Sequence, residues 1–377
     1  MKFTCEREAL LNTIATANKG VVPRPERPIL NCILIELADN TLTATATDQH
    51  LWVRATMQVS DGTDGALAIP ARHFVEALRT CDPGAVTIEA AENQTTMESG
   101  RARFVFNHLN AADYPQMQTS DFTETTVKSE DFLDSLKRVV HARSTDEART
   151  VLTSALFASE NEDGNSLRLV CTDSYRLALR DLRGFELPSV EKDILVPGRA
   201  LEEVSKLAGI DEMTIGVSSQ HVFFSAGDSY FMTQLIDGDY PKYKNLIPEQ
   251  DDYPNCLRIS GDGDSPENQG QAKLKKAISQ VRIMAGPDTP VKLKLEKEKL
   301  TLSTASDHGE SVTELDVNYE GEEMTVAFNP KYLVEGVDAC PGDEIAIYFL
   351  DELKPAVLRG DPEEDFLYLL MPVRVTG

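Results

Sequence analysis

The sequence contains no stretch that predicts a membrane span or a secretion signal. No run of about 18 apolar residues occurs anywhere in the chain. The first residues, Met1-Lys2-Phe3-Thr4-Cys5-Glu6, lack the basic flank and the apolar stretch of a signal peptide. We therefore expect a cytoplasmic protein. A length of 377 residues predicts two or three domains of about 100 to 200 residues each.

Paired cysteines are also missing. The six cysteines lie far apart, with no CxxC pair and no histidine at metal-ligand spacing. This pattern predicts reduced, partly buried thiols, no metal site and no bound cofactor. The cysteines are Cys5, Cys32, Cys81, Cys171, Cys256 and Cys340.

Positive charge is scarce relative to negative charge. The chain has 37 basic and 62 acidic residues, and its net charge is −25. Such a balance excludes a protein that coats phosphate backbones with its whole surface. If DNA is a partner, the cations that bind it must be confined to one surface.

A strand-like segment occurs three times along the chain, which indicates an internal repeat. Leu42 to Asp48 (LTATATD) resembles Leu167 to Asp173 (LRLVCTD) and Leu300 to Asp307 (LTLSTASD). Each copy ends in a hydroxyl residue followed by aspartate. Asp173 follows Asp48 by 125 residues, and Asp307 follows Asp173 by 134 residues.

Two further signatures repeat at nearly the same spacing. A strand that leads through a proline into a helix occurs at 68–78, 195–204 and 327–337. Proline suits the first turn of a helix, where its missing N–H had no intrahelical partner. The third signature aligns Phe104 with Tyr230, because Phe104–Leu109 leads into Asp-Tyr-Pro as Tyr230–Leu235 does, with an offset of 126 residues.

These landmarks predict three copies of one module, at residues 1–123, 124–249 and 250–377. Each copy is expected to contain a helix, several alternating strands, a second helix and further strands. The first helix of the second and third copies has an apolar face. Its residues are Phe132, Leu133, Leu136 and Val140, and then Leu274, Ala277, Ile278 and Val281. A Gly/Asp/Ser/Pro-rich insertion at 260–271 predicts a solvated loop.

The helices also carry cations outside their apolar faces. They are Arg72, Arg79, Lys137, Arg138, Arg199, Lys206, Lys275, Lys276, Arg282 and Lys331, interspersed with Glu76, Glu203 and Glu335. On the pattern alone, mixed solvated helix surfaces explain them. If the helices of all copies faced one centre, the cations would form a positive lining that contacts phosphates without sequence preference.

No catalytic signature occurs in the chain: GxxxxGK[ST], HExxH, GxSxG and GxGxxG after a strand are all absent. The repeated Asp48, Asp173 and Asp307 could be catalytic acids, but such residues more often bond to their own turn. His50 and His308 follow those turns and are too isolated for a metal site or a triad.

Several stretches resemble the bacterial DNA sliding clamp, the beta subunit of the replicative DNA polymerase III holoenzyme, and they extend over the whole chain. The most specific is Cys171 to Ala178 (CTDSYRLA), which resembles the family's ATDGHRLA. Met1 to Glu8, Pro25 to Leu30 and Leu369 to Val375 also match, as do the IPAR and DYP segments at 69–72 and 113–115.

The resemblance implies an α+β fold of three DNA-clamp modules per chain, with two helices and antiparallel sheets in each, assembled as a head-to-tail homodimeric ring. It implies a non-catalytic processivity factor that encircles duplex DNA and tethers its partners. Those partners are the polymerase III catalytic subunit, the clamp loader, and other polymerases and repair proteins that bind through a short peptide. No membrane is involved.

The resemblance also assigns three sets of residues. DNA contacts are expected from Arg24 and Arg72, which match family positions. Arg138, Arg149, Arg199 and Lys276 are added from the helix faces and not from the resemblance. The dimer interface is expected at Phe104, Phe106, Ile283 and Met284. A peptide groove between the second and third modules is expected from Leu152, Thr172, Ser174, Tyr175, Arg176, Leu177, Pro241, Asn245, Leu246, Leu369, Leu370, Met371, Pro372, Val373 and Arg374.

Two features depart from the family's pattern. Ser174 and Tyr175 replace its usual Gly and His, and Thr376 and Gly377 extend the chain. Without the resemblance, the apolar groove residues would be interpreted as core. An enzyme of unknown class and a repeat scaffold that binds only proteins are the alternative functions, and retention on circular but not linear DNA would separate a clamp from both.

Overall fold

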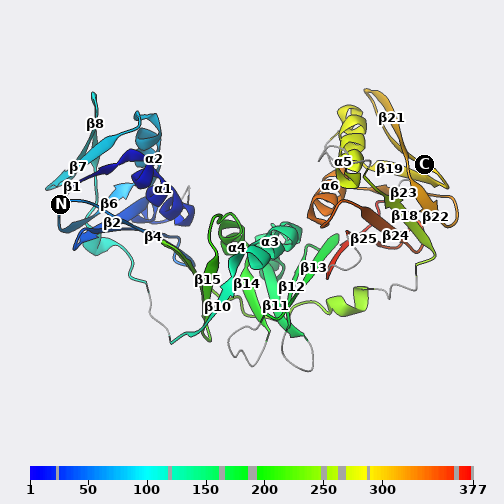
Figure 1. Ribbon diagram of the computed structural model, residues 1–377, viewed down its shortest axis with the longest axis horizontal. Coiled ribbons are helices and arrows are strands. Elements are labelled where there is room, and N and C mark those ends of the chain that lie inside the picture. The colour runs from blue at the N-terminus through cyan, green and yellow to red at the C-terminus, as the bar shows by residue number, and fades with distance from the viewer. Residues whose placement is uncertain are drawn as a thin grey trace. The chain divides into compact units, whose positions relative to one another are not determined.

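The structure, a computed structural model, describes residues 1–22, 25–117, 121–160, 166–185, 193–247, 253–261, 269–286, 289–360 and 365–374 (Figure 1). The chain forms two compact units. One contains Met1–Glu130 and Lys206–Leu235, and the other contains Asp131–Glu186, Glu191–Ser205 and Ile236–Gly377. The fold is α+β with antiparallel sheets, as the sequence predicted.

One order of elements occurs three times: a strand, a helix, a run of strands, a second helix and three strands. The first copy consists of β1 (Lys2–Glu6), α1 (Arg7–Ala17), β2 (Cys32–Ala38), β3 (Thr41–Thr47), β4 (Leu51–Gln58), β5 (Gly62–Thr63), β6 (Gly65–Pro70), α2 (Ala71–Thr80), β7 (Ala85–Ala91), β8 (Gln94–Ser99) and β9 (Ala102–Asn107).

The other two copies follow the same plan. The second consists of β10 (Thr123–Lys128), α3 (Ser129–Val139), β11 (Ser154–Glu160), β12 (Ser166–Thr172), β13 (Arg176–Arg183), β14 (Ile194–Pro197), α4 (Gly198–Val204), β15 (Glu212–Val217), β16 (His221–Ala226) and β17 (Ser229–Gln234). The third consists of β18 (Asn255–Ile259), α5 (Gly270–Val281), β19 (Val291–Glu296), β20 (Lys299–Ser306), β21 (Gly309–Asp316), β22 (Asn318–Glu320), β23 (Met324–Phe328), α6 (Pro330–Ala339), β24 (Ile345–Phe349), β25 (Ala356–Arg359) and β26 (Phe366–Leu370).

The first helix of each copy is followed directly by a 3-10 turn. These turns are η1 (Asn18–Gly20), η4 (Val140–Ala142) and η9 (Arg282–Met284). The apolar face predicted for α3 and α5 is confirmed, because every residue assigned to it is buried. Val140 belongs to that buried face but lies in η4, one residue beyond the helix.

The second helices begin where the strand-to-helix signature predicted. Pro330 occupies the first turn of α6, and the Asn329 side chain accepts from the backbone N–H of Lys331 at 2.9 Å. Pro70 and Pro197 instead precede their helices as the last strand residues. The expectation of a proline within the first helical turn was therefore wrong for two of the three copies.

Two joints link the sheets of successive copies. In the first unit β4 pairs with β17, and in the second unit β13 pairs with β26, both antiparallel. Each joint therefore uses the third strand after the first helix of one copy and the last strand of the next copy. Among the described residues, β9 and β21 lie at sheet ends, where each has one named strand neighbour.

The strand ladders align the copies residue by residue. Ile88, Met97 and Phe104 face one another across β7, β8 and β9. Ile215, Phe224 and Phe231 form the same ladder in the second copy, and Ile347, Leu358 and Tyr368 form it in the third. Phe104 is thus equivalent to Phe231 and not to Tyr230, which corrects the sequence alignment by one residue.

The turn after the repeated strand also shifts by one residue in the third copy. Asp48 accepts from the N–H of His50 at 2.9 Å, and Asp173 accepts from the N–H of Tyr175 at 2.9 Å. The ladders place Ser306 at the equivalent position, and its hydroxyl accepts from the N–H of His308 at 3.1 Å. Asp307 is therefore not the third copy of this residue. Asp48 and Asp173 have the turn-stabilising role that the sequence favoured.

The cysteines are free thiols, buried or half-buried. Burial raises the pKa of Cys32 to about 11 and that of Cys340 to about 12, so these thiols resist ionisation at neutral pH. Over the part of the chain that the structure describes, no helix has the length and apolar character of a membrane span. The same described residues contain no group of three or more His, Cys, Asp or Glu positioned to hold a metal ion.

Candidate functional site

A buried arginine lies where β13 begins. The Arg176 side chain is 6% exposed, and its Nε donates to Asp173 Oδ2 at 3.0 Å. Its Nη2 donates to the His141 carbonyl at 2.6 Å, and Nη1 contacts the Glu335 carboxylate and the Tyr368 hydroxyl. The guanidinium therefore connects β13, η4, α6 and β26 across the joint.

His141 contributes its side chain to the same joint. Its ring stacks on Tyr368 with the centroids 5.7 Å apart. Burial, together with the positive charge of Arg176, lowers the pKa of His141 to about 4. The imidazole is therefore neutral at pH 7.

Two tyrosines lie beside Arg176. Its guanidinium carbon is 4.3 Å from the ring centroid of Tyr332, within the range of a cation–π contact. The Tyr332 ring stacks on Tyr175, with centroids 6.5 Å apart and planes 24° apart. Tyr175 is 60% exposed. The exposed Tyr175 ring is thus linked through the half-buried Tyr332 ring to the buried guanidinium of Arg176.

The tight turn between β12 and β13 presents Tyr175. Asp173 Oδ1 accepts from the backbone N–H of Arg176 at 3.0 Å as well as from that of Tyr175. Ser174 has φ of 80°, a left-handed conformation that favours glycine. Arg149 Nη1 donates to Ser174 Oγ at 3.2 Å. The serine that replaces the family's glycine therefore adopts a strained backbone and gains a side-chain partner.

The segment after β26 runs alongside this turn. The N–H of Met371 donates to the Tyr175 carbonyl at 2.9 Å, and the N–H of Val373 donates to the Ala327 carbonyl at 2.7 Å. Both side chains are 39% exposed. The second unit therefore brings Tyr175 and Met371, which lie far apart in sequence, to one surface.

The predicted groove residues divide into a surface set and a buried set. The exposed members are Ser174, Tyr175, Pro241, Asn245, Leu246, Met371, Val373 and Arg374, and Pro372 is half-buried. The buried members are Leu152, Thr172, Arg176, Leu177, Leu369 and Leu370. Leu177 pairs with Leu369 across the joint, and both pack with Tyr243 of η6 (Tyr243–Leu246). These buried residues are core, so they can shape the groove but do not form its accessible surface.

The predicted DNA-contacting cations have different environments. Arg72 on α2 is 79% exposed and pairs with Glu76, and Arg199 is exposed on α4. Arg138 is 21% exposed and is engaged by Asp134 and the Ala339 carbonyl. Arg149 lies in the 3-10 segment η5 (Glu147–Thr153) beside Ser174, not on a helix face. Arg24 lies outside the described residues.

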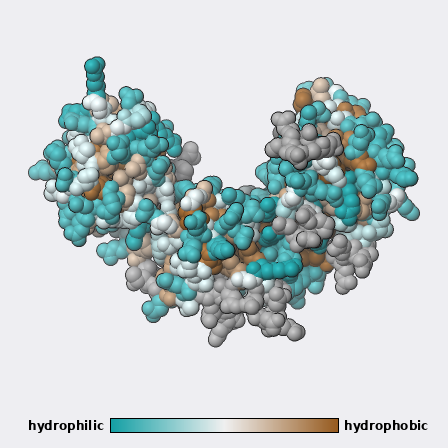
Figure 2. Space-filling model, in the orientation of Figure 1, coloured by the Kyte–Doolittle hydropathy of each residue, from teal (hydrophilic) through white to brown (hydrophobic). Residues whose placement is uncertain are grey.

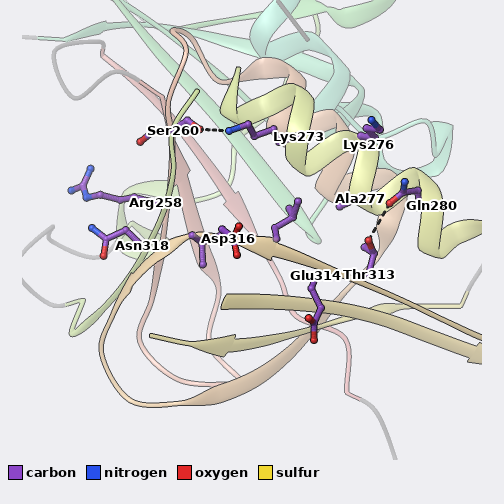
Figure 3. Close-up of a pocket in the computed structure, with 12 residues that line it drawn as sticks. Arg258, Ser260, Lys273, Lys276, Ala277, Gln280, Thr313, Glu314, Asp316 and Asn318 are labelled. Carbon is purple, nitrogen blue, oxygen red and sulfur yellow. Dashed lines mark hydrogen bonds between the residues drawn. The ribbon is translucent and has the colours of Figure 1, made fainter. Parts of the chain in front are cut away.

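Lys276 lines a cleft between α5 and β21. Figure 3 shows Lys273 and Lys276 along α5, with Gln280 bonded to Thr313 on the facing strand. Lys273 donates to the Ser260 carbonyl at 3.2 Å, whereas Lys276 is exposed. In Figure 2 hydrophilic residues cover most of the visible face.

The predicted interface residues also differ in exposure. Ile283 is 78% and Met284 is 38% exposed, both in η9. Phe106 is only 9% exposed and packs edge-on against Phe74 in the core of its own copy. The Phe106 side chain therefore faces the core of its own copy, and its role in the dimer interface stays a prediction. Phe104 is half-buried and stacks on Phe106.

Comparison with known proteins now decides the family. Three family models of the DNA polymerase III beta subunit match consecutive parts of the chain. The N-terminal domain matches residues 1–118, the central domain 126–242 and the C-terminal domain 266–374. The beta sliding clamp of Streptomyces coelicolor is 28% identical, and the alignment covers 100% of both chains.

Two solved structures share the fold over the full length of both chains. The sliding clamp of Bartonella birtlesii, solved with griselimycin bound, is 27% identical with a TM-score of 0.88. The DNA polymerase sliding clamp of Bacillus subtilis is 27% identical with a TM-score of 0.85. The chain belongs to the bacterial beta sliding clamp family.

Family membership makes the chain a DNA sliding clamp of the DNA polymerase III type, a processivity factor in DNA replication. The dimeric ring is the known assembly of this family. The Thr-Asp-Ser-Tyr-Arg motif that carried the sequence resemblance is the turn that holds Tyr175 and Arg176.

Sequence reasoning missed three residues of this site. Tyr332 and Glu335 on α6 hold Arg176 and Tyr175, and Tyr243 covers the joint strands. Glu335 was noticed only as one of three glutamates that dilute the helix cations. The repeated strand-to-helix signature could have marked it, because it places Glu335 at the position that Glu76 holds in the first copy.

Proposed function

We propose that this clamp is a non-catalytic cytoplasmic subunit that closes around duplex DNA as a head-to-tail homodimer and tethers proteins by a short peptide. The observation that carries the proposal is that equivalent strands pair at both internal joints, β4 with β17 and β13 with β26. The remaining equivalents, β21 and β9, lie at the ends of their sheets among the described residues. We also propose the module boundaries 1–123, 124–249 and 250–377.

The two joints within the chain indicate how two subunits of the dimer would contact each other. At each joint the middle residue of the 3-10 turn lies against a ring on the last strand of the next copy. Lys19 of η1 lies over Phe231 at 5.6 Å, and His141 of η4 stacks on Tyr368. Ile283 of η9 is the third such residue, and Phe104 is the third such ring.

The same equivalence gives a register for the proposed pairing of β21 in one subunit with β9 in the other subunit of the dimer. Val53 pairs with Phe231 and Ala178 pairs with Tyr368. The ladders place Ser311 at the position of Val53 and Ala178. Ser311 should therefore face Phe104 of the other subunit in the dimer, with Ile283 packed on that ring. Pairing would also satisfy two open strand edges.

Replacing Ile283 with aspartate should convert the dimer to a monomer at micromolar concentration, because it places a charge against Phe104. Sedimentation of wild type and Ile283→Asp would measure this. Leu353→Asp is a matched control, since Leu353 is 63% exposed but lies outside the proposed interface. A wild-type monomer, or an Ile283→Asp chain that remains dimeric, would contradict the proposed contact.

DNA contact is proposed through phosphates at Arg24, Arg72, Arg138, Arg149, Arg199 and Lys276. The support is strongest for Arg72 and Lys276, which are exposed on helices, although Arg72 pairs with Glu76 on the surface. It is weakest for Arg138, whose side chain is 21% exposed and is bonded to Asp134 and the Ala339 carbonyl. Each lost phosphate contact should reduce the slope of log affinity against log salt by about one unit.

Retention on DNA of different topology tests the clamp itself. Loaded onto nicked circular DNA, the protein should stay bound and then be released when the circle is cut, because it holds DNA by encirclement. Equal release from both forms would favour a scaffold that binds only proteins. Turnover of a substrate by the purified chain would favour an enzyme.

The partner groove is proposed at the surface around Tyr175, Leu246, Met371 and Val373, with the core residues of the predicted set beneath it. The exposed thioether of Met371 can adapt to several partner sequences. Through this groove the clamp would bind the polymerase catalytic subunit, the clamp loader, and other polymerases and repair proteins.

Truncating Met371 to alanine should weaken binding of a Gln/Leu-containing polymerase tail peptide by about 1 to 2 kcal/mol, a plausible hot-spot loss. Calorimetric titration would measure the affinity, and Leu109→Ala would serve as the control, because Leu109 is 41% exposed and belongs to the other compact unit. Circular DNA should still be retained. Unchanged peptide affinity, or unfolding of the variant, would show that Met371 does not belong to the groove.

A further inference from the structure

Glu335 on α6 lies near the predicted groove but is not one of its predicted residues. One carboxylate oxygen contacts Nη1 of Arg176, and the other lies 3.9 Å from Nζ of Lys331. The side chain is 30% exposed. Glu335 therefore reaches from the surface of the helix to the buried guanidinium at the joint.

Arg176 transmits the position of this carboxylate to the turn that bears Tyr175. Its planar guanidinium is fixed from several directions, by Asp173, the His141 carbonyl and the Tyr368 hydroxyl. A guanidinium is oriented by the charged groups that it hydrogen-bonds, and loss of one of these partners leaves the guanidinium freer to rotate.

Tyr332 is the contact between the guanidinium and the groove. It precedes Glu335 by three residues on α6, so both side chains lie on one face of the helix. Its ring contacts Arg176 at 4.3 Å and stacks on Tyr175. The exposed ring of Tyr175 thus depends on Tyr332, which depends on Arg176.

We propose that Glu335 is a positioning residue for the partner groove: by fixing the guanidinium of Arg176 against Tyr332, it holds the Tyr175 ring where a partner peptide binds. This inference rests on the proposed function of the groove. It makes the affinity for partners depend on a carboxylate of α6 that does not touch the peptide.

The first copy offers a matched control. Glu76 occupies the same place on α2 as Glu335 does on α6, and it also pairs with the basic residue four positions earlier, Arg72, at 3.0 Å. The Glu76 side chain is 55% exposed and its ion pair lies on the surface. Glu76→Gln therefore removes an equivalent surface charge without altering the Arg176 contacts.

Griselimycin, which the Bartonella structure contains, is a suitable probe. We expect Glu335→Gln to raise its dissociation constant by about 5-fold, in the range of coupling between contacting residues. Glu335→Asp should recover part of the affinity, and Glu76→Gln should bind as wild type does. Titration calorimetry on the full chain measures all four, and thermal unfolding shows whether each variant is folded.

A double-mutant cycle with Tyr175→Ala distinguishes positioning from general destabilisation. If Glu335 acts through the Tyr175 ring, Glu335→Gln should cause no further loss once that ring is removed. A full additional loss in the Tyr175→Ala background would overturn the proposal, as would wild-type affinity in Glu335→Gln. If the wild-type chain binds no griselimycin, the groove assignment fails and this inference fails with it.

Discussion

The two internal joints share their backbone pairing and differ in the side chains that fill it. At the β13–β26 joint, Arg176 pairs with Leu370 in the ladder and anchors a buried ion network. At the β4–β17 joint, the equivalent rung joins Leu51 to Thr233. Trp52, Phe223 and Met232 form an apolar cluster there.

This difference shows that the repeat determines which strands pair at a joint, whereas individual side chains determine which surface residues lie beside it. Antiparallel pairing and a ring on the last strand recur at both joints, with Phe231 in one and Tyr368 in the other. The exposed Tyr175 and Met371 accompany only the joint with the buried arginine. A buried ion pair is weak evidence for stability, so a role in orienting the groove gives it a functional reason.

The largest effect is expected from Arg176→Ala. Removing the guanidinium leaves Asp173, which is 7% exposed, without its charged partner and should cost about 3 to 5 kcal/mol of unfolding free energy. Urea denaturation of the variant and of wild type would measure this. A loss below about 1 kcal/mol would show that the buried ion network stabilises this joint no more than a surface ion pair would.

A pH-dependent effect of intermediate size is expected from His141. Its folded pKa of about 4 lies below the ordinary value of 6.5, so the unfolded chain binds a proton that the folded chain excludes. Its contribution to stability is fully present above pH 6.5 and is lost as the pH falls toward 4. The loss is at most about 3 kcal/mol.

His141→Phe should flatten this pH dependence while keeping a ring against Tyr368. The urea midpoint between pH 7 and pH 4.5 would reveal it. Arg176, Asp173 and Asp338 also act on His141, so the difference between variant and wild type is the relevant quantity. Parallel pH curves for the two proteins would exclude His141 as the titrating group.

The smallest effect is expected from Lys19, which holds the place of His141 at the other joint. Lys19→Ala should cost about 0.5 to 1 kcal/mol, because it removes a cation–π contact with Phe231 at 5.6 Å. Urea denaturation of the variant and of wild type would measure this loss. A urea midpoint equal to that of wild type would contradict this account.

Much of the fold follows from local patterns. The apolar faces of α3 and α5 are visible because helical spacing places those residues on one side, and that side is buried. The strand-to-helix signatures span the points where β6, β14 and β23 give way to helices. The proposed groove residues Tyr175 and Met371 come from the resemblance, since an isolated Tyr or Met gives no local signal.

The sequence by itself determined the threefold repeat, the helix faces and the family. Only the tertiary structure decided that Phe104 matches Phe231, that Ser306 takes the place of Asp307, and that Phe106 points into its own core. Strand side chains alternate between faces, so a one-residue shift in alignment exchanges core for surface, and only the hydrogen-bonded partner strand resolves it. Arg176 and Glu335 are separated by 159 residues, and no local pattern encodes a contact of that range.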